Sequence, residues 1–134
     1  MKLLLGVYRV LLVLFAGSLW SVGLFAAPTL FNLQPDRHLA GILAGRLFAI
    51  EAYLGLIVLL MALLLPDRRG RFGVFLAAPL LLVNEWLLRP AMSAALGGGP
   101  FLGLSFIAWH GVSAFLYLIA SLSLLYLVWN ENFR

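Results

Sequence analysis

One stretch of the chain, from Val10 to Pro35, contains no charged side chain. A helix needs about 20 apolar residues to cross a bilayer, and this stretch is long enough. The apolar core of a secretory signal peptide is only about 7–15 residues long. Pro28 directly follows the faintly cleavage-like Phe25–Ala27 segment, where it should obstruct a peptidase. The stretch therefore predicts a transmembrane helix that is retained in the mature protein.

The composition of the whole chain also indicates a membrane protein. Of its 134 residues, 64% are apolar and 10% are charged, whereas soluble domains are about 45–50% apolar and about 25% charged. A soluble fold of this length could not bury so much apolar surface. The length allows one domain and leaves no room for a soluble catalytic one. We predict a single membrane domain that covers residues 1–134.

Further apolar runs follow the first one and predict a bundle of helices. Short segments rich in helix breakers separate them: Asn32–His38, Pro66–Arg71 and Gly97–Pro100. The predicted helices cover residues 4–31, 41–65, 72–90 and 101–129. We expect a kink near Pro28 and an end or bend of the third helix at Pro90. Because short loops make consecutive helices antiparallel neighbours, the predicted fold is all-α, an up-down-up-down bundle of four transmembrane helices.

The basic residues predict the orientation of this bundle. With four spans, six of the nine lie on the side of the termini: Lys2, Arg9, Arg68, Arg69, Arg71 and Arg134. Arg37 is the one that clearly lies in the loops of the opposite side. Since loops rich in Lys and Arg stay in the cytoplasm, both termini are predicted to be cytoplasmic. The net charge of +4 is therefore interpreted as a topology signal, and no nucleic-acid partner is expected.

Two acidic residues are separated from the Pro66–Arg71 loop by too few residues to reach the far side of a membrane. The uncharged run after Glu51 has 15 residues, or roughly 22 Å of helix, whereas the hydrocarbon core is about 30 Å thick. Only 13 residues, from Phe72 to Asn84, precede Glu85 in the third helix. If these helices span the bilayer, both carboxylates must lie inside it.

Polar side chains from three helices then fall into one layer. Counted from the outer ends of the helices, Glu51, Glu85 and His110 lie about 9–14 Å deep. Three more polar residues lie slightly nearer the outer surface. The candidate polar pocket in the outer half comprises Glu51, Glu85, His110, Arg46, Asn84 and Arg89.

These residues are expected to pair inside the bundle, because a charge at the membrane centre costs about 2.5–3.5 kcal/mol. Glu85 and Arg89 have the favourable i, i+4 spacing. Glu51 has no such partner in its own helix, so its partner must come from another one, His110 or Arg89 being the natural candidates. Helix four also has a polar face at intervals of three and four residues, made by His110 with Ser113, Tyr117 and Ser121.

Two functional interpretations remain open for this layer. In the first, the pocket binds or passes a small solute, an ion or a proton, with Glu51 and Glu85 as titrating groups and His110 as their partner. In the second, the protein is a structural or accessory membrane subunit. Its buried polar residues then only hold the helices together, at about 0.6 kcal/mol for each hydrogen bond.

Other classes of function have less support. The chain has no cysteine, and its two histidines are His38, in a predicted loop, and His110, in a helix. Because soft metals need several such ligands, no metal and no cofactor is expected. Ser113 lies three residues after His110, but no nucleophile elbow accompanies the pair, so we favour a non-enzymatic protein. Its partners would be the lipid bilayer and a small solute. Four helices are few for a transporter, so a transporting unit would be a homo-oligomer.

Three segments resemble a known family: Leu19–Phe31 (LWSVGLFAAPTLF), Ala40–Phe48 and Phe106–Ser113. They are similar to the bacterial membrane proteins catalogued as domain of unknown function 4149, which resemble transmembrane-protein-205-like proteins. Pro90 fits a proline usual at the end of the third helix in this family. The resemblance implies a four-helix protein of the bacterial inner membrane and supplies no reaction. The first helix is remotely similar to copper-resistance membrane domains with Leu-Trp-x-Gly-Gly, a pattern that Ser21-Val22 breaks.

Overall fold

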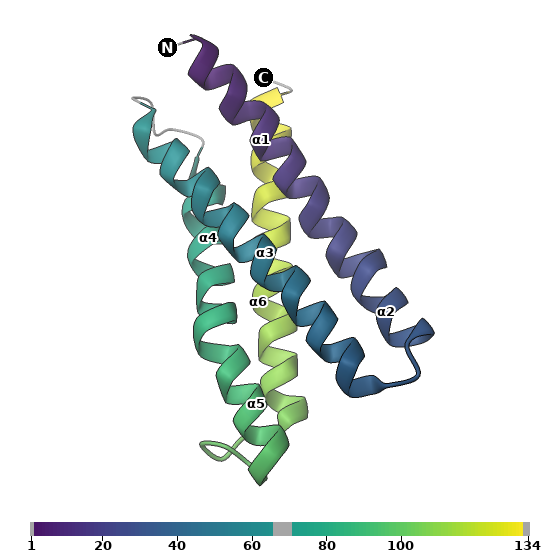
Figure 1. Cartoon of the computed structure of the whole chain (residues 1–134). Helices are drawn as coiled ribbons and strands as arrows, with labels where there is room; N and C mark the ends of the chain where they lie inside the picture. Colours follow the sequence, from purple (N-terminus) through teal and green to yellow (C-terminus); the bar gives the residue numbers. More distant parts are fainter. Residues whose placement is uncertain (1, 66–70, 133–134) are drawn as a thin grey trace.

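Four long helices form the protein, which is represented by a computed structural model that describes residues 2–65 and 71–132 (Figure 1). They run alternately up and down, so the predicted all-α, four-helix fold is confirmed. Each is long and apolar enough to cross a membrane: Lys2–Leu33, Arg37–Leu64, Phe72–Leu96 and Phe106–Asn130. The chain is therefore a multi-pass integral membrane protein.

Two of the four helices contain a π-helical turn. The first consists of α1 (Lys2–Ser21), the π-helix η1 (Val22–Ala26) and α2 (Ala27–Leu33), and the second is α3 (Arg37–Leu64). The third consists of α4 (Phe72–Val83), the π-helix η2 (Asn84–Leu88) and α5 (Arg89–Gly98), and the fourth is α6 (Phe106–Asn132).

Both π-turns end two residues before a proline. The backbone N–H of Ala27 donates to the carbonyl of Val22, and that of Arg89 donates to Asn84, each five residues back. A proline has no N–H, and its ring clashes with the carbonyl four residues earlier in a regular α-helix. The wider π-turn relieves this conflict, so the chain continues past Pro28 and Pro90. The prediction that the third helix ends near residue 90 is therefore wrong, since α5 extends it to Gly98.

Two other helix boundaries differ from those predicted. The second helix begins at Arg37 instead of near residue 41, because Asp36 Oδ1 accepts the N–H groups of His38 and Leu39 at 2.9 and 3.2 Å and so caps the helix. The fourth begins at Phe106 instead of near residue 101. A tight turn precedes it, closed by reciprocal backbone hydrogen bonds of 3.0 and 3.1 Å between Phe101 and Leu104.

The apolar core lies in the half of the bundle that holds the two termini, called the terminal half below. Residues from α1, α4 and the C-terminal halves of α3 and α6 build it. Gly73 lets α4 approach α6 closely, since a Cβ there would lie 2.5 Å from the carbonyl oxygen of Ser123. The largest fully buried side chains are Tyr8, Leu12, Leu19, Val74, Leu124 and Leu127.

Arg71, interpreted from the sequence as a loop residue that signals topology, is buried in the structure, with 4% of its surface exposed. Its Nη1 donates to the carbonyl oxygens of Ala62 and Leu65 at 2.8 and 3.0 Å, and its guanidinium lies 5.9 Å from the centre of the Tyr8 ring. Arg71 thus satisfies carbonyl groups at the end of α3 that no helical N–H can reach. The other basic residues of this loop, Arg68 and Arg69, and the terminal Arg134 lie outside the described residues.

The first and second helices form one hairpin (α1 to α3), and the third and fourth form another (α4 to α6). The two hairpins diverge in the other half of the molecule, called the divergent half below. Helix α3 packs against α1, α2 and α4, but its backbone does not come close to α5 or α6. Likewise α2 packs against α3 and not against α5 or α6. A gap therefore separates α2 and the first half of α3 from α5 and the first half of α6 (Figure 1).

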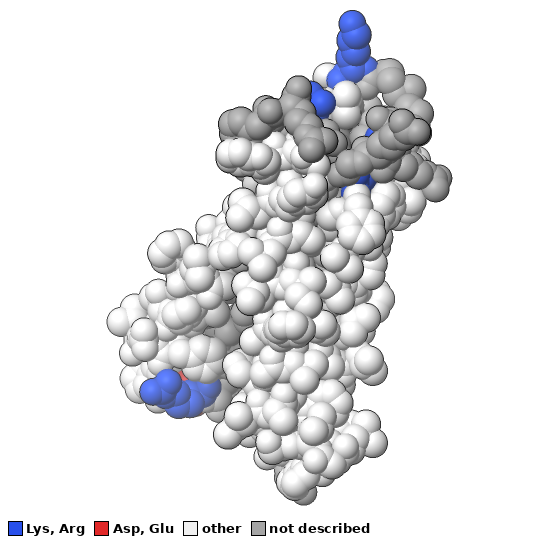
Figure 2. Space-filling view, turned by 180° about the vertical axis from the view of Figure 1, so that it is seen from behind, with Lys and Arg blue, Asp and Glu red and all other residues white. Residues whose placement is uncertain are grey.

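The charged side chains follow the same division of the molecule. On the face shown in Figure 2, they form two groups, one at the end with the termini and one towards the opposite end. The broad band between them carries no charged side chain on this face. Such an uncharged band is what the hydrocarbon core of a bilayer requires.

Candidate functional site

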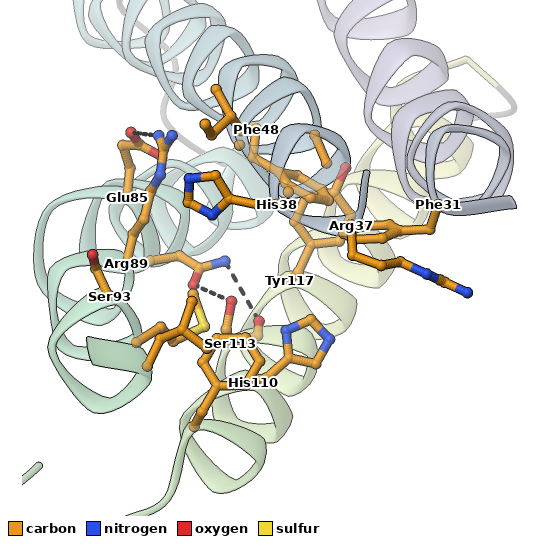
Figure 3. Close-up of a pocket in the computed structure, with 18 of the residues that line it drawn as sticks. Phe31, Arg37, His38, Phe48, Glu85, Arg89, Ser93, His110, Ser113 and Tyr117 are labelled. Atoms are coloured by element: carbon orange, nitrogen blue, oxygen red, sulfur yellow. Dashed lines mark hydrogen bonds and ion pairs between the residues drawn. The ribbon is translucent and has the colours of Figure 1, made fainter. Parts of the chain in front are cut away.

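A cavity of about 640 Å³ lies between the diverging hairpins. This volume is within the range of about 300–1,000 Å³ that is typical of small-molecule sites. Its walls are largely apolar and include Phe31, Ile42, Phe48, Leu81, Met92, Leu96 and Phe106. Its polar lining consists of Arg37, His38, Asn84, Glu85, Arg89, Ser93, His110, Ser113 and Tyr117 (Figure 3).

Most of the residues expected in a polar pocket line this cavity. Four members of the candidate set do so, Asn84, Glu85, Arg89 and His110, together with two residues of the polar face of helix four, Ser113 and Tyr117. The other three predicted residues, Arg46, Glu51 and Ser121, do not line it. Arg46 is an exposed residue of α3.

An ion pair from the third helix reaches across the gap between the hairpins. Glu85, in η2, accepts a hydrogen bond from Nη1 of Arg89, one turn later in α5, as their spacing predicts. The Arg89 guanidinium rests on the backbone of α3, since a Cβ on Gly45 would lie only 2.5 Å from its Nη2. A glycine at position 45 is thus what allows Arg89 to lie against α3. A Cβ on Gly41, one turn earlier, would have no neighbouring atom within 4 Å.

The amide of Asn84 joins η2 to α6. Ser113 Oγ donates to Asn84 Oδ1 at 2.6 Å, and Asn84 Nδ2 donates to the Ser113 carbonyl oxygen at 3.4 Å. Ser113 is thus hydrogen-bonded to the third helix and not to His110. Because the π-turn begins at Asn84, the same segment that passes Pro90 presents Asn84 and Glu85 to the cavity.

Tyr117 closes the cavity on the side of the core. Its hydroxyl donates to the carbonyl oxygen of Leu19 at 2.6 Å. Its ring meets that of Phe48 edge-on, with 5.1 Å between centroids, and a Cβ on Gly23 would lie 2.9 Å from the tyrosine ring. Ser121 is buried and donates to the Tyr117 carbonyl within its own helix. Tyr117 therefore ties α6 to α1.

Both histidines of the chain line the cavity. His110 stacks on Phe106 in α6, with 6.0 Å between ring centroids, and His38 lies in the first turn of α3. Within residues 2–65 and 71–132, no hydrogen bond to either imidazole ring is present (Figure 3). The prediction that His38 lies in a loop is wrong, and the helix-capping signal of Asp36 could have corrected it. Arg37 is also at the cavity, but its guanidinium points away from it (Figure 3).

Glu51 faces the interior of the bundle, where 3% of its surface is exposed, but it has a different partner from those expected. Its Oε2 accepts a hydrogen bond of 3.0 Å from Ser18 Oγ in α1. Neither His110 nor Arg89 contacts it, because α1 packs directly against α3 at this level. The expected partners His110 and Arg89 are therefore wrong. The hydrogen bond of Glu51 links α3 to α1, and Tyr117 of the fourth helix interacts with Glu51 electrostatically.

Metal-binding side chains do not gather in the part of the chain that the structure describes, where no group of three His, Asp or Glu residues converges on one point. The polar chemistry of the cavity consists instead of one ion pair, one amide–hydroxyl pair, two imidazoles, the exposed hydroxyl of Ser93, the hydroxyl of Tyr117 and Arg37. Such groups suit hydrogen bonding to a solute.

Comparison with known families matches residues 10–99 to the family described as Domain of unknown function (DUF4149). No curated protein and no solved structure matches the chain. The family match begins within α1, extends through α5 and ends before α6, so the similarity suggested for Phe106–Ser113 stays a prediction. Because the matched residues make up more than half of the chain, this four-helix integral membrane protein belongs to the DUF4149 family.

Proposed function

We propose that the cavity binds a small solute, with Glu85, Arg89, His38 and His110 as the polar groups that contact it. The observation that carries this proposal is a cavity of about 640 Å³ between helices long and apolar enough to span a membrane, lined by ionisable side chains from both hairpins. Polar groups inside a membrane protein usually face the interior of the bundle and mark the path or the site of a ligand.

The distribution of hydrogen bonds supports a ligand. The two imidazole rings and the Ser93 hydroxyl line the cavity, and no hydrogen bond of theirs to the described residues is present. His38, Ser93 and His110 are exposed residues, so their polar groups are accessible to a solute in the cavity. A solute with complementary groups would form hydrogen bonds with them.

A structural role is the second candidate, and it is favoured for a different set of residues. Glu51, Asn84 and Tyr117 each form a hydrogen bond to another helix. We therefore propose that these three residues hold the bundle together. The ion pair Glu85–Arg89 and the two imidazoles are the groups that we assign to binding.

The orientation that we propose puts both termini in the cytoplasm of a bacterial inner membrane, so the cavity lies in the outer half. The excess of basic residues on the side of the bundle that holds both termini supports this orientation. A protein that passes its solute across the membrane would then work as a homo-oligomer, because one cavity of four helices reaches only part of the way.

A single introduced thiol tests the binding proposal, because the chain has no cysteine of its own. Ser93→Cys puts the thiol at the cavity, and Thr29→Cys puts one on an exposed part of α2 that does not line it. Both variants, in nanodiscs, are treated with a small maleimide in the presence of organic acids, amines and neutral solutes. We expect at least one class to slow labelling of Ser93→Cys several-fold and to leave Thr29→Cys unchanged. If no class of solute slowed the labelling of Ser93→Cys more than that of Thr29→Cys, the proposal would be contradicted.

A further inference from the structure

The imbalance of polar groups in the cavity points to the kind of molecule that fits it. We infer that its occupant is an amphipathic anion, a molecule with one acidic head and an apolar body, and that Arg89 binds the head. This inference rests on the proposed function, of which it specifies the ligand.

Arg89 has hydrogen-bond donors that no described residue uses. Glu85 is the one acidic residue in the described lining, and Arg89 already neutralises it. The guanidinium has five N–H donors, of which Nη1 supplies the bond to Glu85, and no other described group accepts from it. Its planar fork matches a carboxylate or a phosphate, to which it can donate two parallel hydrogen bonds.

The surroundings of Arg89 provide further donors and no further acid. Ser93 lies one turn along α5, and the imidazole rings of His38 and His110 line the walls on α3 and α6 (Figure 3). Arg37 lies at the edge of the cavity, and its guanidinium points away from it. A cationic head would meet one acidic residue of the described lining, which Arg89 already pairs, whereas an anionic head would meet the donors of Arg89.

The apolar walls require that the ligand has an apolar body. Phe48, Leu81 and Phe106 face the same cavity as the ion pair, and a small hydrophilic anion would leave them in contact with water. The backbone of α3 does not come close to that of α5 or α6, although Arg89 and Tyr117 reach α3 with their side chains. The apolar tail of a ligand from the bilayer would enter through this gap between the hairpins.

The position of Arg89 depends on Gly45, and this provides a test that leaves the charges in place. A methyl group at Gly45 would lie within about 2.5–3.2 Å of Nη2, Cζ and Nε of Arg89. The guanidinium is the far end of a flexible side chain, so Gly45→Ala should fold and move the guanidinium away from α3. Gly41→Ala adds the same methyl group one turn earlier, where no atom lies within 4 Å.

Binding is measured on the full chain in a neutral maltoside detergent by native mass spectrometry. The ligands are dodecanoate, dodecyl phosphate, dodecylamine and dodecanol, which share one tail, and inorganic phosphate, which has none. We expect the two acids to bind about tenfold or more tightly than the amine and the alcohol, because a bidentate contact to Arg89 is charge-assisted. Inorganic phosphate alone should bind weakly. If dodecyl phosphate binds and dodecanoate does not, the head is a phosphate, and the reverse result identifies a carboxylate.

Variants then locate the contact. Arg89→Gln should abolish the preference for acids, whereas Arg46→Gln, which removes an exposed charge outside the cavity, should keep it. If Arg89→Gln does not fold because Glu85 loses its partner, the double variant Glu85→Gln/Arg89→Gln removes both charges together. Gly45→Ala should weaken acid binding several-fold, and Gly41→Ala should retain the preference.

Different failures have different meanings. Equal binding of dodecanol and dodecanoate, or equal losses in Arg89→Gln and Arg46→Gln, would overturn the inference and leave cavity binding intact. The same holds if no dodecyl compound binds while another solute still protects Ser93→Cys. If no compound binds and none protects the thiol, the inference and the proposed function both fail.

Discussion

At the scale of residues, the polar side chains divide according to what they contact. Glu51, Asn84 and Tyr117 are hydrogen-bonded to a neighbouring helix, whereas the imidazoles of His38 and His110 face the cavity. Local spacing correctly predicted the pair Glu85–Arg89, because both residues belong to one helix. The partner of Glu51 could not be predicted, because it depends on which helices are neighbours and on their rotation.

The hydrogen bond between Ser18 and Glu51 provides a prediction at this scale. Ser18→Ala removes the described donor to a buried carboxylate and should lower the free energy of unfolding by about 1–3 kcal/mol. Glu51→Gln keeps the shape and removes the charge, so it should fold and bind cavity ligands normally. Thermal unfolding in detergent and the thiol-protection assay measure the two effects. Loss of ligand protection in Glu51→Gln would place Glu51 among the binding residues after all.

At the scale of elements, the prolines have an effect that the sequence rules for helix ends do not describe. Those rules stop a helix before a proline, but the π-turns η1 and η2 carry the chain past Pro28 and Pro90. A π-turn inserts one residue into the helix, and one residue corresponds to a rotation of about 100°. The direction in which α5 presents its side chains therefore depends on η2, and the sequence gives no signal for this turn.

Replacement of Pro90 should convert the π-turn into regular α-helix. In Pro90→Ala the missing N–H is restored, so α5 can rotate relative to α4 and turn Ser93 from the cavity. We expect the labelling rate of Ser93→Cys to change several-fold in this background. Pro79→Ala is the control, because Pro79 lies inside α4 and no π-turn precedes it. An unchanged labelling rate in Pro90→Ala would show that the π-turn has another cause.

At the scale of the whole molecule, the four spans follow from the apolar runs, and their number and order were correctly predicted. The divergence of the hairpins could not be predicted. Lipid chains are as apolar as the interior of a bundle, so exposed residues of a spanning helix, such as Ile107 and Phe115, have the same character as core residues such as Leu124. Hydrophobic pattern alone cannot separate packed surfaces from open ones.

The proposed orientation is testable with the same cysteine-free background. Leu3→Cys lies near the amino terminus, and Asn32→Cys lies at the opposite end of the first helical segment; both positions are exposed. In intact bacterial cells, a membrane-impermeant maleimide should label Asn32→Cys and reach Leu3→Cys only after permeabilisation. The reverse pattern would place the cavity in the cytoplasmic half.

The divergence of the hairpins makes the protein a wedge with its thin end at the core. Because the buried core joins the hairpins in the terminal half, whereas the backbone of α3 does not come close to that of α5 or α6, a change in the angle between the hairpins would move little of the core. Such a change alters the area that the protein occupies in one leaflet far more than in the other. A change in the angle between the hairpins would therefore alter the volume of the cavity together with the area that the protein occupies in that leaflet.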